Sequence, residues 1–141
     1  QTVVEKLVPL ARLVTPNSDE AALLTGLTVN TAKDQERAGR RLLELGAAGA
    51  LVKGGHLKGT RVVDVLVTRD GARRFTHPRI ESTSTHGTGC TLSAGIAAGL
   101  ALGYSLTDAI TRAKAYVTRA IREGFQAGRG VGQLRHFLAE W

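Results

Sequence analysis

The chain has 141 residues, 43% of them hydrophobic, which suits one compact α/β domain with a real core and is too short for two independent domains. Its 19 lysines and arginines exceed its 12 acidic residues, but they are dispersed and only 4% of residues are aromatic, so small anions such as nucleotides fit better than nucleic acid. A single cysteine excludes an internal disulfide, and no run of residues resembles a membrane span or a signal peptide, so a cytoplasmic protein is expected.

The first third of the chain alternates between strand and helix signals. Residues 2–11 read like the tail of a helix and the sequence contains no methionine, so we expect a piece of a longer protein. Residues 12–15 form a short β-like run, and the polar residues 17–20 then open a helix that stops at Gly26. Strand followed by helix is typical of an α/β fold.

A second helix is predicted from about residue 33 to 45, followed by a buried strand over 50–53 and the break Gly54-Gly55. These elements complete a βαβ-like unit. Two β-rich runs, 62–68 and 72–76, are then separated by Arg69-Asp70-Gly71, and the Asp-Gly pair predicts an antiparallel hairpin at the edge of the sheet.

The remainder of the chain is predicted to be helical. One helix runs from Cys90 to about residue 102, a second from 106 to about 124, and a last short segment covers 131–141. The first of these helices carries no charge and is rich in alanine and glycine, so we expect it to be buried and to anchor the loop that precedes it. Together the elements predict a single partial domain over residues 1–141.

The loop that leads into this helix has the composition of an anion site. Residues 84–95 read STHGTGCTLSAG. Backbone N–H groups of the turn Gly87-Thr88-Gly89 can point at one centre, and the helix behind them adds further donors and the positive end of its dipole. The same field would favour the thiolate form of Cys90, which could act as a base. A tight turn capped by glycine explains the same spacing.

Other site types fit this loop poorly. It lacks the Gly-Lys-Ser/Thr ending of a P-loop, and Leu92 stands where a dinucleotide fingerprint has its third glycine. A lone cysteine with four scattered histidines does not supply a zinc site. A Cys-His nucleophilic pair of Cys90 with His86 would straddle the junction of loop and helix, so we favour a His86 side chain that bonds within its own turn.

Three motifs in order, TPNSDEA at 15–21, VKGGHL at 52–57 and THGTGCTLSA at 85–94, resemble the hydroxymethylpyrimidine/phosphomethylpyrimidine kinase family of thiamine biosynthesis. The resemblance continues through AKAYV at 113–117 and LRHF at 134–137, and it matches only the C-terminal half of that family. It implies a ribokinase-like, three-layer α/β/α fold, of which this chain is the C-terminal portion with a β-hairpin edge.

The resemblance also implies an activity. The family transfers phosphate from ATP to the hydroxymethyl group of the pyrimidine and then to its monophosphate. Gly87, Thr88 and Gly89 would form the anion hole that stabilises charge on the transferred group. Cys90 would be the catalytic base, at a position where most ribokinase-like enzymes have an aspartate.

Four further residues match nucleotide-side positions of the family, which uses ATP and Mg²⁺. Asn17 and Glu20 match an Asn-x-x-Glu element associated with Mg²⁺ and phosphate, although a helix N-cap with a first-turn acid explains them equally. Lys53 stands where a cation could reach ATP phosphates, or it is a strand-end lysine. Lys114 matches another nucleotide-side lysine, although an exposed helical role is also open. Asp19 is expected to face solvent.

The sequence departs from the family in two respects. Residues 130–133 read GVGQ where the family has a Gly-His-Gly-Pro-like turn, and the N-terminal half that supplies most of the pyrimidine pocket is not in this chain. We therefore expect a homo-oligomer or association with that half. Three alternatives stay open: a vitamin B6 (pyridoxal-type) kinase, a non-catalytic ATP-binding regulatory module, and a structural half-domain that only dimerises.

Overall fold

The computed structural model describes residues 2–82, 86–126 and 128–138. Ser84 and Thr85 of the glycine-rich loop, and Trp141 at the end of the terminal segment, lie outside the described residues. The chain divides into two compact units, Gln1–Arg79 and Ile80–Trp141.

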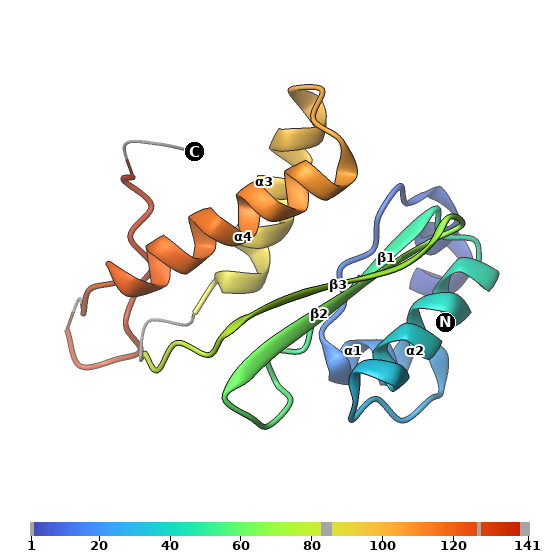
Figure 1. Ribbon diagram of the computed structural model, residues 1–141, viewed down its shortest axis with the longest axis horizontal. Helices are drawn as coiled ribbons and strands as arrows, with labels where there is room; N and C mark the ends of the chain where they lie inside the picture. Colours follow the sequence, from blue (N-terminus) through green and yellow to red (C-terminus); the bar gives the residue numbers. More distant parts are fainter. Residues whose placement is uncertain (1, 83–85, 127, 139–141) are drawn as a thin grey trace. The chain divides into compact units, whose positions relative to one another are not determined.

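The first unit is built on an antiparallel sheet in the order β1-β2-β3, with β1 at Gly49–Val52, β2 at Arg61–Thr68 and β3 at Gly71–Pro78 (Figure 1). The predicted hairpin is confirmed. Because Gly71 pairs with Thr68, its loop has only two residues, Arg69 and Asp70. Gly71 has a φ of 135°, which a residue without a side chain adopts most easily.

A short extended segment before the first α-helix pairs with the other side of β1. Val14 and Ala50 form a parallel bridge, and so do Asn17 and Lys53. The Leu51 N–H donates to the Val14 carbonyl oxygen at 2.8 Å. Parallel pairing across an intervening pair of helices confirms the βαβ-like unit expected from the sequence.

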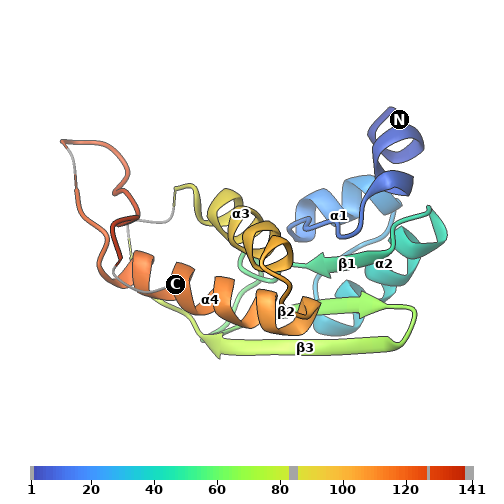
Figure 2. The ribbon, with the colours of Figure 1, turned by 90° about the horizontal axis from the view of Figure 1, so that it is seen from above.

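Two helices, α1 at Ser18–Thr25 and α2 at Ala32–Glu44, connect the parallel segments; α2 packs on β1 and β2, and α1 packs against α2 (Figure 2). Each helix begins with a capping box. The side chain of the N-cap residue, Asn17 or Thr31, accepts a hydrogen bond from the backbone N–H of the third helical residue. The carboxylate of that third residue, Glu20 or Asp34, accepts one from the backbone N–H of the N-cap residue. Gly26 ends α1 with a φ of 73°. These local signals explain why both helices lie close to their predicted bounds.

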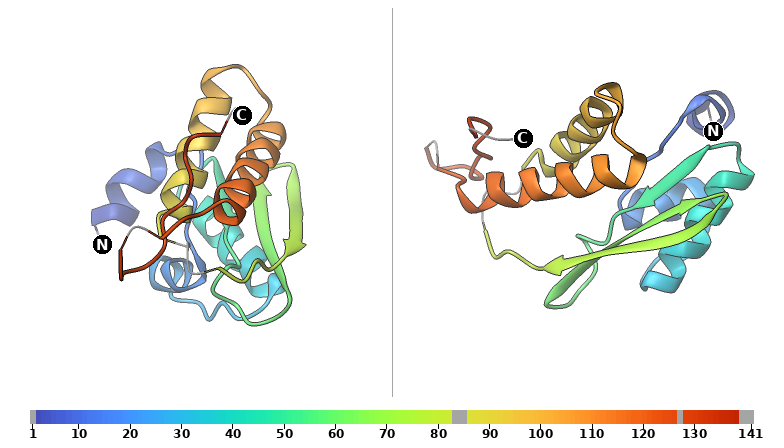
Figure 3. Two further views of the ribbon diagram at one scale, coloured as in Figure 1. Left: turned by 90° about the vertical axis from the view of Figure 1, so that its left-hand side faces the viewer. Right: turned by 45° about the horizontal axis from the view of Figure 1, so that its top comes forward.

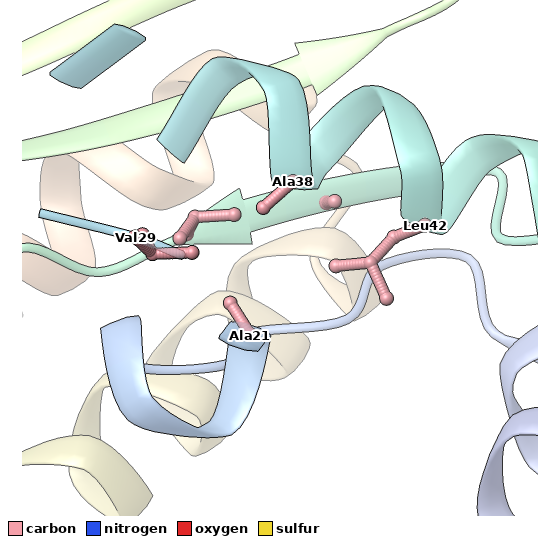
Figure 4. Packing of buried hydrophobic residues seen from close by; sticks show 6 residues of the cluster. Ala21, Val29, Ala38 and Leu42 are labelled. Atoms are coloured by element: carbon pink, nitrogen blue, oxygen red, sulfur yellow. The ribbon is translucent and has the colours of Figure 1, made fainter. Parts of the chain in front are cut away.

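The core of the first unit lies between these helices and β1 (Figure 4). At its closest point α2 lies directly over β2, where a Cβ added to Gly39 would sit 2.5 Å from Val67 Cγ2. Glycine at this position lets helix and sheet approach within side-chain contact distance. The buried members of the cluster are small or branched apolar residues: Ala21, Val29, Ala38, Leu42, Ala50 and Val52.

The first residues of the chain are helical, as predicted, but in short irregular turns. A π-helical turn, η1, covers Val3–Leu7 and a 3₁₀ turn, η2, covers Val8–Leu10. Val8 is buried, and a Cβ on Gly46 would lie 3.0 Å from Pro9, so η2 is packed against the connection from α2 to β1.

The second unit contains a helical hairpin of α3, Thr88–Ala101, and α4, Leu106–Arg122 (Figure 3). Gly103, with a φ of 86°, lies in the connection, and the Ser105 side chain caps α4 by accepting from the Asp108 N–H. The prediction that α3 is buried is only partly right. Leu92, Gly95, Ile96 and Gly99 are buried, whereas the opposite face is exposed because its short side chains cost little in water; it comprises Cys90, Ala94, Ala97, Ala98 and Ala101.

The prediction that the last segment is helical is wrong for residues 131–138, which are extended or irregular. Phe125 and Gln133 exchange two backbone hydrogen bonds of 3.0 and 2.8 Å, and the Arg135 N–H donates to the Ala120 carbonyl oxygen. Leu134 is buried. Contacts distant in sequence therefore hold this segment along α4 instead of local helical hydrogen bonds.

In the part of the chain that the structure describes, no helix has both the length and the apolar character required to cross a bilayer.

Candidate nucleotide-phosphate site

Asn17 and Lys53, predicted separately from two motifs, are neighbours in the structure. They form the last bridge between the two parallel segments, and the Lys53 N–H donates to the Pro16 carbonyl oxygen at 2.8 Å. Both residues follow strand segments at their carboxyl ends, and ligands of open α/β sheets bind beyond these ends. The first unit therefore places Asn17 and Lys53 on neighbouring strand ends, at the edge where a ligand is expected.

Glu20 faces back toward Asn17 through the capping box. The Asn17 N–H donates to Glu20 Oε2 at 2.7 Å, and the Glu20 N–H donates to Asn17 Oδ1 at 2.8 Å. The helix cap that the sequence left as an alternative is thus present. It holds one carboxylate oxygen of Glu20 and the amide oxygen of Asn17 at the start of α1, next to Lys53, where the dipole of the helix also favours anions.

The loop that follows Lys53 is held at two places. His56 Nδ1 lies 3.1 Å from Asp19 Oδ2, which links the loop to the first turn of α1. The carboxylate of Asp19 is 84% exposed, consistent with the expectation that it faces solvent. The Arg79 guanidinium donates to three carbonyl oxygens of the loop, at Gly55, Leu57 and Gly59.

The Gly-Thr-Gly motif lies in the second unit and forms the start of α3. Gly87 is the N-cap with a φ of 83°, and Thr88 and Gly89 already belong to the helix, which therefore begins two residues earlier than predicted. The first intrahelical hydrogen bond runs from the Thr91 N–H to the Gly87 carbonyl oxygen at 2.9 Å. The N–H groups of residues 88–90 precede that bond, so they are the donors available at a helix N-terminus.

Cys90 is the third residue of α3 and its side chain is exposed. Hydroxyl groups on the same turns bond inward, since Thr91 Oγ1 donates to the Gly87 carbonyl oxygen and Ser93 Oγ to that of Gly89. The thiol is thus presented to solvent beside the donors of the helix start. His86, just before the cap, is exposed and pairs through its backbone with Gln133.

The pairing of His86 with Gln133 also positions residues 130–133, where the sequence departs from the family pattern. Gln133 bridges both His86 and Phe125, so residues 132–134 lie next to the start of α3 without a Gly-His-Gly-Pro-like turn. Lys114 lies in the middle of α4, in the same unit as Cys90, and is half-buried. The nucleotide role of Lys114 stays a prediction.

Hydrogen bonds at the start of α2 stabilise the ionised form of one carboxyl group, that of Asp34. The hydroxyl of Thr31 donates to Asp34, and with the N–H groups of Asn30 and Thr31 and the nearby Arg37 it lowers the pKa of the Asp34 carboxyl below its ordinary value of 3.8. Within the described ranges, no group of three or more His, Cys, Asp or Glu side chains is arranged to hold a metal ion.

Sequence reasoning missed three residues that shape this region. Gln35 and Asp64 are buried polar residues beneath the Lys53-Gly54 turn, and Arg79 holds the loop above. A glutamine on the otherwise charged helix α2 and an aspartate inside a run of valines were the available signals. Their partners lie 10 to 28 residues away along the chain, which composition alone does not reveal.

Comparison with known proteins assigns the chain to a family. The family model described as phosphomethylpyrimidine kinase matches residues 1–135. The chain is 50% identical over 135 residues to the thiamine biosynthesis bifunctional protein ThiED of Geobacter sulfurreducens, covering 96% of this chain and 28% of that protein. It is 44% identical over 142 residues to the hydroxymethylpyrimidine/phosphomethylpyrimidine kinase of Rhizobium meliloti, covering 99% of this chain and 53% of that protein.

A solved structure resembles the fold of this chain closely. The ADP complex of Bacillus subtilis pyridoxal kinase has a TM-score of 0.91 and 38% identity, covering 96% of this chain and 54% of that chain. The similarity confirms the α/β, ribokinase-like fold class, and the chain spans about half the length, or less, of these relatives. It matches their C-terminal part, as predicted from the motifs. The chain belongs to the phosphomethylpyrimidine kinase family.

Proposed function

We propose that this chain is the nucleotide-binding and catalytic half of an ATP-dependent kinase that phosphorylates hydroxymethylpyrimidine and then its monophosphate. The observation that carries the proposal is the start of α3, where an exposed Cys90 thiol lies in the first turn together with the N–H donors of residues 88–90. Family membership and 44% identity to a kinase of this name support it.

The chemistry divides among these groups. Cys90, as thiolate, would take the proton of the substrate hydroxyl, so that this oxygen attacks the γ-phosphorus as the bond to the leaving ADP oxygen breaks. The N–H groups at Gly89 and Cys90, with the glycine turn at Gly87, would donate to the oxygens of the transferred group, where negative charge develops. Thr88 supplies a further donor of this turn.

Asn17, Lys53 and Glu20 are assigned to the phosphates of ATP. The Lys53 ammonium would neutralise phosphate charge, and Lys114 is proposed as a second nucleotide-side cation. The donor set of Glu20 carboxylate and Asn17 amide fits Mg²⁺, which keeps several waters and needs only one or two protein oxygens in addition to phosphates. When bound, Mg²⁺ would shield phosphate charge, with Glu20 holding its water shell from α1.

A pyridoxal-type kinase is the second candidate, favoured by the TM-score of 0.91 to the pyridoxal kinase of Bacillus subtilis. Both reactions phosphorylate an alcohol on a heteroaromatic ring, so the half described here would serve either. We place the residues that choose the acceptor in the part of the relatives that this chain does not span, and propose that the chain acts in association with that part.

The test compares this chain alone with the same chain preceded by the N-terminal half of its relatives. MgATP binding is measured for both, together with phosphorylation of hydroxymethylpyrimidine, its monophosphate and pyridoxal. We expect turnover with the pyrimidines in the extended protein. Preferential turnover of pyridoxal would support the second candidate, and the absence of nucleotide binding and turnover in both forms would reject a kinase.

Cys90→Ala in the extended protein separates a catalytic role from a merely ATP-binding module. Loss of a general base predicts a fall in kcat of about 100-fold to 10,000-fold with MgATP affinity retained. Ala94→Ser, an exposed change one helical turn further on, is the matched control and should leave kcat unchanged. An unchanged kcat in Cys90→Ala would remove Cys90 from the mechanism.

A further inference from the structure

The backbone around Lys53 is held by two buried polar side chains that the proposed chemistry does not use. Val52 is the last residue of β1 that pairs with β2, opposite Val65. Beyond this pair the regular hydrogen-bond ladder between β1 and β2 ends, and Lys53 is paired on its other side by its bridge to Asn17. Contacts outside that ladder therefore fix the direction in which Lys53 leaves the sheet.

Gln35 of α2 supplies one such contact. Its side chain is fully buried, and Nε2 donates to the Val52 carbonyl oxygen at 3.0 Å and to that of Val63 at 2.9 Å. One amide group thus bridges both strands where their ladder ends. Gln35 Oε1 is buried and has no hydrogen-bond partner among the described residues, so the side chain is oriented by its two donations.

Asp64 of β2 supplies the other contact. Only 3% of this residue is exposed, and Oδ1 accepts from the Gly54 N–H at 2.9 Å. A buried carboxylate needs such donors, and a hydrogen bond to a charged acceptor is about twice as strong as a neutral one. Since the Lys53 N–H donates to Pro16, the peptide groups on both sides of the Lys53 Cα are fixed.

Steric contact adds to these hydrogen bonds. A Cβ on Gly54 would lie 2.1 Å from the Val63 carbonyl oxygen and 3.0 Å from Gln35 Nε2. The chain therefore passes β2 as closely as glycine allows, and only glycine fits. At the next residue, Gly55, a Cβ would meet no atom within 4 Å, so the constraint is confined to the turn directly after Lys53.

We propose that Asp64 and Gln35 are positioning residues for nucleotide binding: they hold the Lys53-Gly54 turn so that the Lys53 ammonium extends beside Asn17 toward a nucleotide phosphate. This inference rests on the proposed function of Lys53. A lysine side chain is flexible, so ordering it on a phosphate costs conformational entropy. A fixed Lys53 backbone lowers this cost, because fewer positions are open to the ammonium group.

The experiment is a double-mutant cycle in the extended protein. Asp64→Ala and Lys53→Ala are made singly and together, and the KM for ATP and kcat are measured. Asp64→Ala is expected to raise the KM for ATP on the order of tenfold. Because Asp64 acts through Lys53, it should add nothing further once Lys53 is alanine. Asp64→Asn retains an acceptor oxygen and should recover most of the affinity.

Gln35→Met, which keeps the volume of the side chain and removes both donations, provides an independent arm should Asp64→Ala fail to fold. It should raise the KM for ATP in the same Lys53-dependent way. Asp70→Asn, at an exposed turn between β2 and β3, loses the same charge as Asp64→Asn and should leave the KM unchanged. Faster amide exchange at Gly54 in Asp64→Ala is the structural readout.

Additive effects of Asp64→Ala and Lys53→Ala, or unchanged amide exchange at Gly54, would overturn the positioning role. Unchanged ATP affinity in Lys53→Ala would also overturn it, because there would be no phosphate contact to position. The proposed kinase function is judged separately, by turnover of the unsubstituted extended protein and by Cys90→Ala.

Discussion

Glu20 combines a helix cap with the proposed Mg²⁺ role, and two substitutions separate them. Glu20→Gln keeps an oxygen that can accept from the Asn17 N–H, so the free energy of unfolding should stay within about 0.5 kcal/mol of the unsubstituted protein. It loses the charge, so the Mg²⁺ concentration that gives half-maximal turnover should rise on the order of tenfold. Glu20→Ala should show both defects.

Asp19→Asn is the control for this prediction, because it removes one charge from the same turn of α1. Its exposed carboxylate contacts His56 and is not assigned to Mg²⁺. An equal shift of the Mg²⁺ requirement in Asp19→Asn and Glu20→Gln would mean that general charge, and not the Glu20 carboxylate, sets it. Turnover of the extended protein is the measurement.

The lowered pKa of Asp34 predicts how the stability of the fold changes at acid pH. Its folded-state pKa lies below the ordinary value of 3.8, chiefly because the Thr31 hydroxyl donates to it. The ionised carboxylate therefore favours the folded state at pH values above 3.8, and this contribution is lost as the pH falls through the lowered pKa. In Thr31→Ala the stability should fall less than in the unsubstituted protein when the pH is lowered below 3.8. In Thr31→Ser, which keeps the hydroxyl, the stability should fall as much as in the unsubstituted protein. Urea unfolding at several pH values measures the difference, and identical profiles for the two variants would contradict the assignment.

Two adjacent glycines test the steric argument at the end of β1. Gly54→Ala places a methyl group against the Val63 carbonyl oxygen, so it should lower the free energy of unfolding by about 2 kcal/mol or more. Gly55→Ala meets no atom within 4 Å and should be within about 0.5 kcal/mol of the unsubstituted protein. Similar losses for both variants in chemical denaturation would show that the turn relaxes around the added group.

Among the elements, α2 depends on close packing to the sheet. In Gly39→Ala the helix gains about 1 kcal/mol of intrinsic propensity, but the new methyl group lies 2.5 Å from Val67 Cγ2, and crowding of this kind costs about 1–3 kcal/mol. Because Val67 is branched at Cβ and has little rotamer freedom, we expect a net loss of about 1 kcal/mol. Thermal unfolding, with the exposed Arg40→Ala as control, measures it, and a net gain would show that α2 shifts away from β2.

The elements also show what sequence could predict. The bounds of α1 and α2 follow from local signals, namely the capping boxes at Asn17 and Thr31 and the glycine at Gly26. The helix α3 starts two residues before the predicted Cys90 because Thr88 and Gly89, although weak helix formers, enter the helix after the positive φ of Gly87. The terminal segment is not the predicted helix because pairing of Gln133 with Phe125, eight residues away in sequence, decides its conformation.

Some residues of the candidate site could likewise be predicted from the sequence, and others could not. Asn17, Lys53 and Cys90 could be selected from the sequence because they stand in motifs that resemble those of the family. Gln35 and Asp64 could not, since their importance comes from contacts with β1 and the turn beyond it. The roles of the selected residues remain predictions to be tested.

At the scale of the whole molecule, the net charge of +7 should assist binding of anionic nucleotides through a long-range field. Exposed charges are screened beyond about 8 Å at physiological salt, whereas direct contacts are screened less. Replacing both Arg73 and Arg74, exposed on β3, with glutamine should therefore weaken MgATP binding mainly at low salt, and Lys53→Ala should weaken it at low and high salt alike.

Titration calorimetry of the extended protein at about 0.02 M and about 0.3 M salt measures this difference. A uniform loss of affinity for the Arg73 and Arg74 replacement at both salt concentrations would show direct contact with the nucleotide. An affinity that does not vary with salt in the unsubstituted protein would show that the net charge has no part in binding.

The single cysteine of this chain stands exposed in the first turn of α3. A thiol-reactive fluorophore will therefore attach to this chain at one place, without removal of other cysteines, and that place adjoins the donors proposed to meet phosphate. Emission of the labelled chain offers a direct optical titration of nucleotide binding that needs no turnover, and protection of the thiol from labelling by ATP offers the complementary chemical footprint.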